Sequence, residues 1–434
     1  MRRTVIGILF VVCIALAASA PAMAAPASTY VEVYNPAGIR EDGAYIDKLL
    51  TQIIKDTGMR GPQLAGAFPA GRTERLKVRQ DAPAEINELF YRRGWTDGLP
   101  IVIPTVDRVR RMLRGTDFGP ETLVALLDPM QGQATVEKIA VNAVMAGCKP
   151  EYMPVLIAAV EALANPAAGL KGLATTTSPD APLLILTGPI IRELDLNAGT
   201  NSMGRGRQAN AAIGRALQLI INNLGGSWPG VTDMSTLGNP AEYSWVVAEN
   251  AALNPWTSLN ADLGLPQSAS VATVFGAEGI RGIIAGGRSS EDWLKLVAAH
   301  AEGLAAQRPH WPMVLLIIAS DTAAQLKRDG WDKDSIRAAI LKFCNAHHPE
   351  EGTGPRSAAQ PSAPRFSIDH FLILVAGGTG EKSMLIPGWL GASGPVSKPI
   401  RVPERGNAIR ENPRRLGLRI ALPDTIHITY RREC

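Results

Sequence analysis

Apolar runs and amphipathic stretches alternate along the chain. Four runs rich in Leu, Ile, Val and Phe, at 183–187, 271–275, 313–319 and 371–376, have the length and composition of strands buried on both faces. A small-residue loop and a helical pattern are expected to follow each run. This alternation predicts an α/β fold: a partly parallel sheet flanked by helices.

The clearest amphipathic helix is expected over residues 208–224, where the double glycine Gly225-Gly226 would end it. Its apolar positions fall on one face: Ala209, Ile213, Ala216, Leu217, Ile220, Ile221 and Leu224. Two shorter helices are expected from Ala84 and from near Thr105, a residue type that caps helix N-termini. These helices would cover the sheet.

Residues 135–146 and 150–164 predict a helical hairpin, joined by Gly147-Cys148-Lys149. Gly147 suits the left-handed position after a helix, and Pro150 suits a first helical turn because its missing N–H would have had no partner there. The hairpin therefore carries a cysteine at its tip.

Five segments can be separated along the chain, and no internal repeat is evident. They are a signal peptide (1–24), a loop-rich N-terminal arm with one helix at 43–56 (25–85), a main α/β domain (86–349), a linker or long loop (350–365), and a C-terminal subdomain or set of closing strands (366–434). The linker assignment rests on its Gly, Pro, Ser and Ala content.

The first residues predict export. Arg2 and Arg3 precede an apolar stretch at 5–18, and Ala22-Met23-Ala24 forms a small-residue cleavage site. The apolar stretch is shorter than the roughly 20 residues of a spanning helix, so no stable membrane span is expected. We expect cleavage near Ala24 and a periplasmic or secreted protein.

Charge and cysteine content narrow the possible partners. The 44 basic and 40 acidic residues give a net charge of +4, and the basic residues are dispersed, so no nucleic-acid partner is expected. Cleavage of the signal peptide would leave three cysteines, Cys148, Cys344 and Cys434. This odd number leaves at least one thiol free or paired between chains, so a homo-oligomer stays possible.

The first candidate site is the loop at 197–207, which leads directly into the amphipathic helix. Backbone N–H groups at a helix start, together with Arg205 and Arg207, are suited to hold an anion, which Asn201 and Ser202 would orient. The alternative is a long capping loop whose arginines face water.

The second candidate is the glycine-rich turn Gly377, Gly378 and Gly380 at the end of the last apolar run. Glu381 separates the last glycine from Lys382, which breaks the spacing of a phosphate-binding loop, so ATP is not expected. The turn would close a ligand pocket, or else simply approach a neighbouring backbone.

The third candidate is Cys148, whose pKa the adjacent helix start and Lys149 would lower, favouring a nucleophilic thiolate. Glu137 and Lys138, on the preceding helix, would line a cleft beside it, with Glu137 as a possible base. The alternatives are a small buried cysteine and a solvated helix face.

No metal site is predicted, because no two histidines have the i, i+4 spacing of a helical zinc motif. Cys344 with His347 and His348 is the one local cluster of metal-binding residue types, and adjacent histidines usually point apart. The sequence indicates no particular cofactor.

Three segments carry a resemblance to a known family: 91–100 (YRRGWTDGLP), 135–148 (TVEKIAVNAVMAGC) and the loop around Asn201. Between about residues 84 and 256 the chain resembles a poorly characterised bacterial family, and residues 375–383 show a weaker likeness to it. Members of this family are associated, as neighbouring or fused domains, with UGSC-type thiol or selenol proteins. The resemblance implies an enzyme in which Cys148 and the Arg205 loop matter. The chain lacks a Cys-Gly-Ser-Cys sequence, and its signal peptide departs from the family.

We therefore expect an exported soluble enzyme that acts on a small anionic or carbonyl-bearing molecule, with Cys148 as the nucleophile. The alternative is a non-catalytic periplasmic binding protein that uses the same loops for a small-molecule ligand. Such receptors often consist of two similar lobes joined by crossing strands. Since no duplication is visible in the sequence, the enzyme is favoured.

Overall fold

The computed structural model describes residues 30–38, 75–79, 82–305, 313–346, 367–389 and 394–403. The predicted signal peptide, the helix at 43–56, the linker at 350–365 and the pair His347 and His348 lie outside the described residues. The other predicted helices and strands fall within them.

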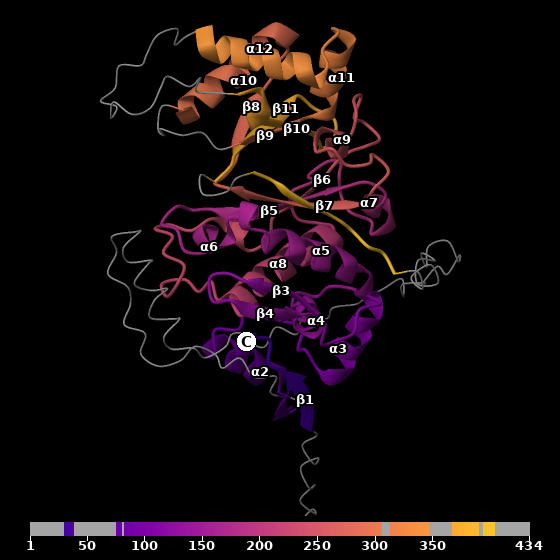
Figure 1. Cartoon of the computed structure of the whole chain (residues 1–434), viewed down its shortest axis with the longest axis vertical. Helices are drawn as coiled ribbons and strands as arrows, with labels where there is room; N and C mark the ends of the chain where they lie inside the picture. The colour runs from indigo at the N-terminus through magenta and orange to yellow at the C-terminus, as the bar shows by residue number, and fades with distance from the viewer. Residues whose placement is uncertain are drawn as a thin grey trace, which may run out of the picture.

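Two four-stranded sheets form the centre of the molecule (Figure 1). The first has the order β12-β7-β5-β6, with β5 (Ala181–Thr187), β6 (Val246–Ala248), β7 (Val271–Ala277) and β12 (Val396–Pro399). The second has the order β10-β9-β11-β8, with β8 (Arg281–Ile284), β9 (Val314–Ile318), β10 (Phe371–Val375) and β11 (Lys382–Pro387).

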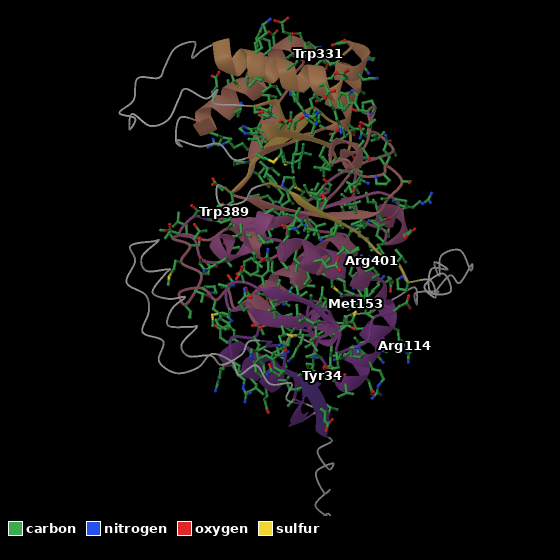
Figure 2. All side chains as sticks on the ribbon, in the orientation of Figure 1. Tyr34, Arg114, Met153, Trp331, Trp389 and Arg401 are labelled. Carbon is green, nitrogen blue, oxygen red and sulfur yellow. The ribbon has the colours of Figure 1, made fainter. Side chains whose placement is uncertain are left out.

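The two sheets pack face to face, and helices cover their outer faces (Figure 1). Leu183, Ile185 and Phe275 of the first sheet share one core with Leu315 and Ile317 of the second. The first sheet is covered by α5 (Met153–Leu163) and α8 (Gln208–Ile220), and the second by α10 (Ser290–Ala305) and α12 (Lys333–Ala346). Side chains fill the spaces between these four layers (Figure 2).

The sheets are mixed, which confirms the α/β class and its parallel part. The pairs β5–β6 and β9–β10 are parallel, whereas β7 and β11 run antiparallel to their neighbours. The prediction that every apolar run leads into a helix is wrong for two of them, because β7 is followed by β8, and β10 by β11. The connections after Ala277 and Val375 are too short to hold a helix.

The chain contains a duplication that the sequence does not reveal. In order along the chain, α5, β5, α7 (Ile190–Glu193), α8, β6, β7 and β8 correspond to α10, β9, α11 (Ser320–Arg328), α12, β10, β11 and β12. In both units the second strand is parallel to the first and the third is antiparallel to it. The expectation of no internal repeat is therefore wrong at the level of topology.

Each unit gives its last strand to the other sheet: β8 pairs with β11, and β12 pairs with β7. The two connections cross where Ala277 and Gly388 form an antiparallel bridge. There Glu278 N donates to Pro387 O (3.1 Å), and Trp389 N donates to Gly276 O (2.8 Å). The crossing joins the two units through backbone contacts.

The residues before α5 form a further layer beneath the first sheet's helices (Figure 1). Its elements are β1 (Tyr30–Tyr34), β2 (Arg75–Arg79), α2 (Pro83–Arg92), α3 (Val106–Met112), β3 (Leu123–Leu127), β4 (Gly132–Thr135) and α4 (Val136–Met145). The predicted hairpin is confirmed in α4 and α5, with Gly147 at φ +81°. Thr105 caps α3 as expected, accepting a hydrogen bond from Arg108 N.

Two short α-helices, α6 (Leu170–Leu173) and α9 (Leu259–Asp262), lie in the connections, and a π-helical segment, Ile221–Gly225, continues α8. No single helix in the described residues combines the length and apolar character needed to cross a membrane. One bent pair, Pro150–Leu163 with Pro166–Leu173, meets those two criteria jointly.

The crossing leaves no room for a side chain at Gly388. A Cβ there would lie 2.6 Å from Met313 O and 2.9 Å from the Phe275 ring. Gly388→Ala should therefore lower the free energy of unfolding by about 2 kcal/mol, measured by denaturant titration.

Gly303→Ala is the matched control, since Gly303 is exposed on α10 with open space around its Cβ position. That change should raise stability by roughly 0.5–1 kcal/mol, the usual gain for Gly to Ala in a helix. Equal stability of Gly388→Ala and wild type would contradict the close approach at the crossing.

Candidate functional site

The three regions predicted to carry chemistry meet near the start of α8. Gly377 N donates to Ala198 O (2.9 Å), and a Cβ on Gly378 would lie 2.0 Å from Thr200 Oγ1, so the glycine turn lies directly against the 197–207 loop. On another side of the helix, Cys148 Sγ donates to Ala212 O (3.3 Å). The sequence thus selected loops that converge in space.

Most polar groups of these loops already have protein partners. Asn201 adopts φ +60° and its Nδ2 donates to Arg205 O (2.9 Å), while Arg207 pairs with Asp195 at 2.5 Å. The backbone N–H of Gly380 donates to Asp321 Oδ2 (2.7 Å). Ser202 is buried. Within the described part of the chain, the Arg205 guanidinium is left without a partner.

Cys148 does not have the lowered thiol pKa that was expected of a nucleophile. Burial raises the pKa of its thiol above the usual range, and the nearby positive charge of Arg215 offsets this only in part. The prediction that the following helix start and Lys149 would lower this pKa is wrong, because desolvation of the thiolate outweighs them. The group is a protonated thiol that bonds to a backbone carbonyl.

Glu137 and Lys138 do not lie beside Cys148. They begin α4, whereas Cys148 follows its C-terminal end, about 15 Å away along the helix axis. Lys138 Nζ donates to Asn35 O (2.7 Å), and burial lowers the pKa of this amine to about 8. The cleft expected from these three residues does not form, and Lys138 instead ties α4 to the N-terminal segment.

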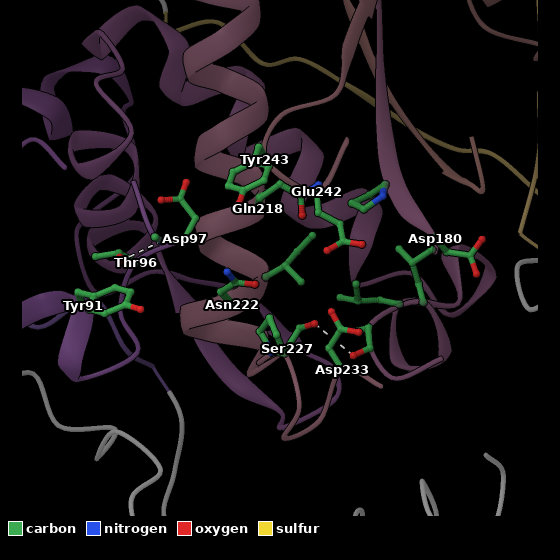
Figure 3. Close-up of a pocket in the computed structure, with 17 residues that line it drawn as sticks. Tyr91, Thr96, Asp97, Asp180, Gln218, Asn222, Ser227, Asp233, Glu242 and Tyr243 are labelled. Carbon is green, nitrogen blue, oxygen red and sulfur yellow. Dashed lines mark hydrogen bonds between the residues drawn. The ribbon is translucent and has the colours of Figure 1, made fainter. Parts of the chain in front are cut away.

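A cavity of about 330 Å³ lies further along α8 (Figure 3). It is bounded by α8, α6, the turn that follows α2, and the segment from Ser227 to Tyr243. Its lining residues are Tyr91, Thr96, Asp97, Gly98, Leu170, Leu173, Ala174, Asp180, Pro182, Gln218, Ile221, Asn222, Ser227, Pro229, Asp233, Glu242 and Tyr243. Ten of these 17 residues are polar or charged, so the lining is mixed, with polar groups that could fix the orientation of a small molecule.

Two amides about one turn apart line this cavity: Gln218 on α8, and Asn222 on the π-helical segment Ile221–Gly225 that continues it. Gln218 is only 6% exposed, and among the described residues its side chain has no hydrogen-bond partner. The half-buried Asn222 side chain likewise lacks a partner there. Figure 3 shows both side chains pointing from this helical stretch toward the cavity. Neither amide is among the described side-chain atoms that are buried without a partner, so both open onto the cavity and can bond to a ligand there.

Two carboxyls face α8 from the 227–243 segment (Figure 3). Asp233 accepts a hydrogen bond from Ser235 N (2.9 Å), and Glu242 accepts one from Asn239 N (2.8 Å). Burial raises the pKa of both carboxyls, and the charge of Asp233 raises that of Glu242 further. Perturbed carboxyls in a cavity are a common sign of a functional site.

A buried ion pair builds the wall opposite these carboxyls. Arg215 binds both oxygens of Asp97 (Nε–Oδ2 2.7 Å, Nη2–Oδ1 2.9 Å) and also donates to Pro100 O (2.9 Å). Asn223 Nδ2 donates to Trp95 O (3.0 Å) and to Asn142 Oδ1 (2.7 Å). The segment 91–100, one of those behind the family resemblance, is thereby fixed against α8.

The cavity residues were not among the predicted site residues. Gln218 lies outside the apolar stripe of α8 and is nevertheless buried, so the sequence pattern gave no signal for it. Asp233 and Glu242 come from a segment without a recognisable motif, so only the three-dimensional structure brings them to α8. Within the described ranges, no group of three or more His, Cys, Asp or Glu residues could hold a metal ion.

The comparisons with known proteins identify no relative: no family model matches the chain, and no curated protein matches it.

Glu249 is a third carboxyl with a raised pKa, and its position is structural. It follows β6 and is 1% exposed, and its Oε1 accepts hydrogen bonds from Leu259 N (2.9 Å) and Asn254 Nδ2 (3.1 Å). Burial is the main cause of its raised pKa. It ties β6 to the start of α9.

The Glu249 carboxyl should make stability depend on pH. Below its ordinary pKa of 4.5 the carboxyl is protonated in the folded and unfolded chains alike; as pH rises, the unfolded chain releases the proton first and the folded state loses stability. Glu249→Gln keeps the acceptor oxygen but cannot ionise. Denaturant titrations from pH 4 to pH 8 should show the variant gaining stability relative to wild type, and a constant difference would contradict the raised pKa.

The thiol of Cys148 should be slow to alkylate. In a chain whose other cysteines are replaced by serine, iodoacetamide at pH 7.5 should modify the folded protein at least about 100-fold more slowly than the urea-unfolded protein, because the partly buried thiol bonds to Ala212 O and its raised pKa keeps it protonated. The rate is measured by mass spectrometry. A folded protein that reacts as fast as the unfolded one would restore the nucleophile hypothesis.

Proposed function

We propose that this chain is an exported protein that binds a small polar molecule in the cavity beside α8. The observation that carries the proposal is Gln218: a residue only 6% exposed whose amide has no protein partner among the described residues and opens onto a cavity of about 330 Å³. A ligand in the cavity could donate to the Gln218 amide oxygen and accept from its NH₂ group. Export is proposed from the N-terminal sequence alone.

The surroundings of Gln218 support a binding role. Leu170, Leu173 and Ile221 offer apolar contact, while Asn222 and Glu242 offer hydrogen bonds. The buried Asp97–Arg215 pair fixes one wall in place, and a preformed site loses less entropy when its ligand binds. The cavity's size, its mixed polar and apolar lining and its fixed wall are together typical of a site that binds a small molecule.

The second candidate is an enzyme that acts on a small anionic molecule near the start of α8. It is favoured by the contact between the 197–207 loop and the glycine turn, beside which the Arg205 guanidinium has no partner in the described residues. The two candidates predict different sites, so substitutions separate them. Arg205→Ala should abolish binding only if the second candidate is correct.

Asn222→Trp tests the proposed function by filling the cavity. The Asn222 side chain makes no hydrogen bond with the described residues, so the fold should tolerate its replacement. Native and denaturing mass spectra of the purified protein should differ by the mass of a small molecule in the wild type, and this difference should disappear in Asn222→Trp.

Ala211→Trp is the matched control, because it places the same ring on the exposed face of the same helix. It should retain the bound mass. A bound mass that persists in Asn222→Trp and disappears in Arg205→Ala would instead support the second candidate.

A further inference from the structure

We infer that the ligand of this cavity carries a positively charged group, an ammonium or amidinium, that is held by Asp233 and Glu242. This inference rests on the proposed function and names its ligand class. For this cavity we thus infer a cationic ligand, whereas the sequence led us to expect an anionic or carbonyl-bearing one.

Charge balance is the first argument. The 17 lining residues include four acids, and none of these described residues is a Lys, Arg or His. Arg215 neutralises Asp97 from behind the wall, but neither Asp233 nor Glu242 has an ion pair among the described residues. Partly buried carboxylates without a counter-ion are unfavourable, and a cationic ligand supplies that counter-ion.

Hydrogen-bond capacity is the second argument. One oxygen of Asp233 and one of Glu242 already accept a backbone N–H, which leaves each carboxylate a second oxygen able to accept. The amide oxygens of Gln218 and Asn222 add further acceptors on the facing helix. An ammonium group donates three hydrogen bonds and accepts none, so it matches a site rich in acceptors.

The remaining walls suit the rest of such a ligand. Leu170, Leu173 and Pro229 would contact a short hydrocarbon segment. Tyr91 and Tyr243, which are 60% and 51% exposed, add two aromatic rings whose faces attract cations. These features favour a short aliphatic amine, diamine or amidine over a polyol or an acid.

Three four-carbon compounds that differ in charge provide the test: 1,4-diaminobutane, 1,4-butanediol and succinate. Isothermal titration calorimetry of the full chain at pH 8 should show binding of the diamine, at least about 10-fold weaker binding of the diol, and none of succinate. Tenfold corresponds to about 1.4 kcal/mol, a modest value for a charge-assisted hydrogen bond. The diamine should also bind at least about 10-fold more weakly at pH 4, where the carboxyls are protonated.

Glu242→Gln should weaken diamine binding at least about 10-fold and weaken diol binding by a clearly smaller factor, because the diol loses no ion pair. The substitution keeps the oxygen that accepts Asn239 N, so the local turn is preserved. Glu85→Gln, an exposed position in the first turn of α2, makes the same change in net charge and should have no effect. Asp233→Asn provides an independent second variant.

The outcomes separate the ligand class from the binding function. If the diol or succinate binds as tightly as the diamine and Asn222→Trp blocks this binding, the inference of a cationic ligand is overturned, but the cavity is still a ligand site. Diamine binding that Glu242→Gln and Asp233→Asn leave unchanged would also overturn the inference. If none of the three compounds binds at 10 mM and no molecule co-purifies with the wild type, both the inference and the proposed function fail.

Discussion

The architecture depends on strands that are buried on both faces. All seven residues of β5 and of β7 are buried, as are all five of β9 and of β10. A sheet built from such strands needs an apolar layer on each side. Here the second sheet supplies one layer and helices supply the other, so the stacked sheets and their helical covers follow from one requirement.

The same requirement extends to the helices next to the first sheet. Every residue of α5 except Glu161 is buried, and every residue of α4 except Glu137. The N-terminal layer meets this need and places Asn142, Asn223 and Trp95 in one hydrogen-bonded group. Two buried atoms of this group, Trp95 Nε1 and Asn223 Oδ1, still lack a partner among the described residues, whereas the unbonded amide of Gln218 opens onto the cavity.

Local structure could be predicted from the sequence because it depends on neighbours in the chain. Caps such as Thr105, turn glycines such as Gly147 and the stripe of α8 all lie where the pattern put them. Strand partners could not be predicted, since pairing joins residues far apart. The duplication stayed hidden because the two units share burial and connectivity more than residue identity: Gly188-Pro189 joins β5 to α7, whereas Ala319 alone joins β9 to α11.

The sites were predictable only in part, for a similar reason. Glycine and arginine loops are visible in a sequence, and two of them do meet, but most of their donors bind the protein itself. The cavity draws on segments from Tyr91 to Tyr243, each unremarkable alone. Its chemistry depends on which side chains lack a partner, a property of the assembled fold.

The exchanged strands have a consequence for how the chain reaches its native state. Ile283 pairs with Ser383, and Val396 pairs with Val274, so neither sheet is complete until nearly the whole described chain is present. Contacts over such distances slow folding and leave strand edges open in the meantime. If the chain were cut between the two units, each fragment would lack the strand that the other unit supplies, and the edges of β7 and β11 would be exposed. Two such fragments could then pair these edges with each other's last strands and form the same crossing between separate molecules.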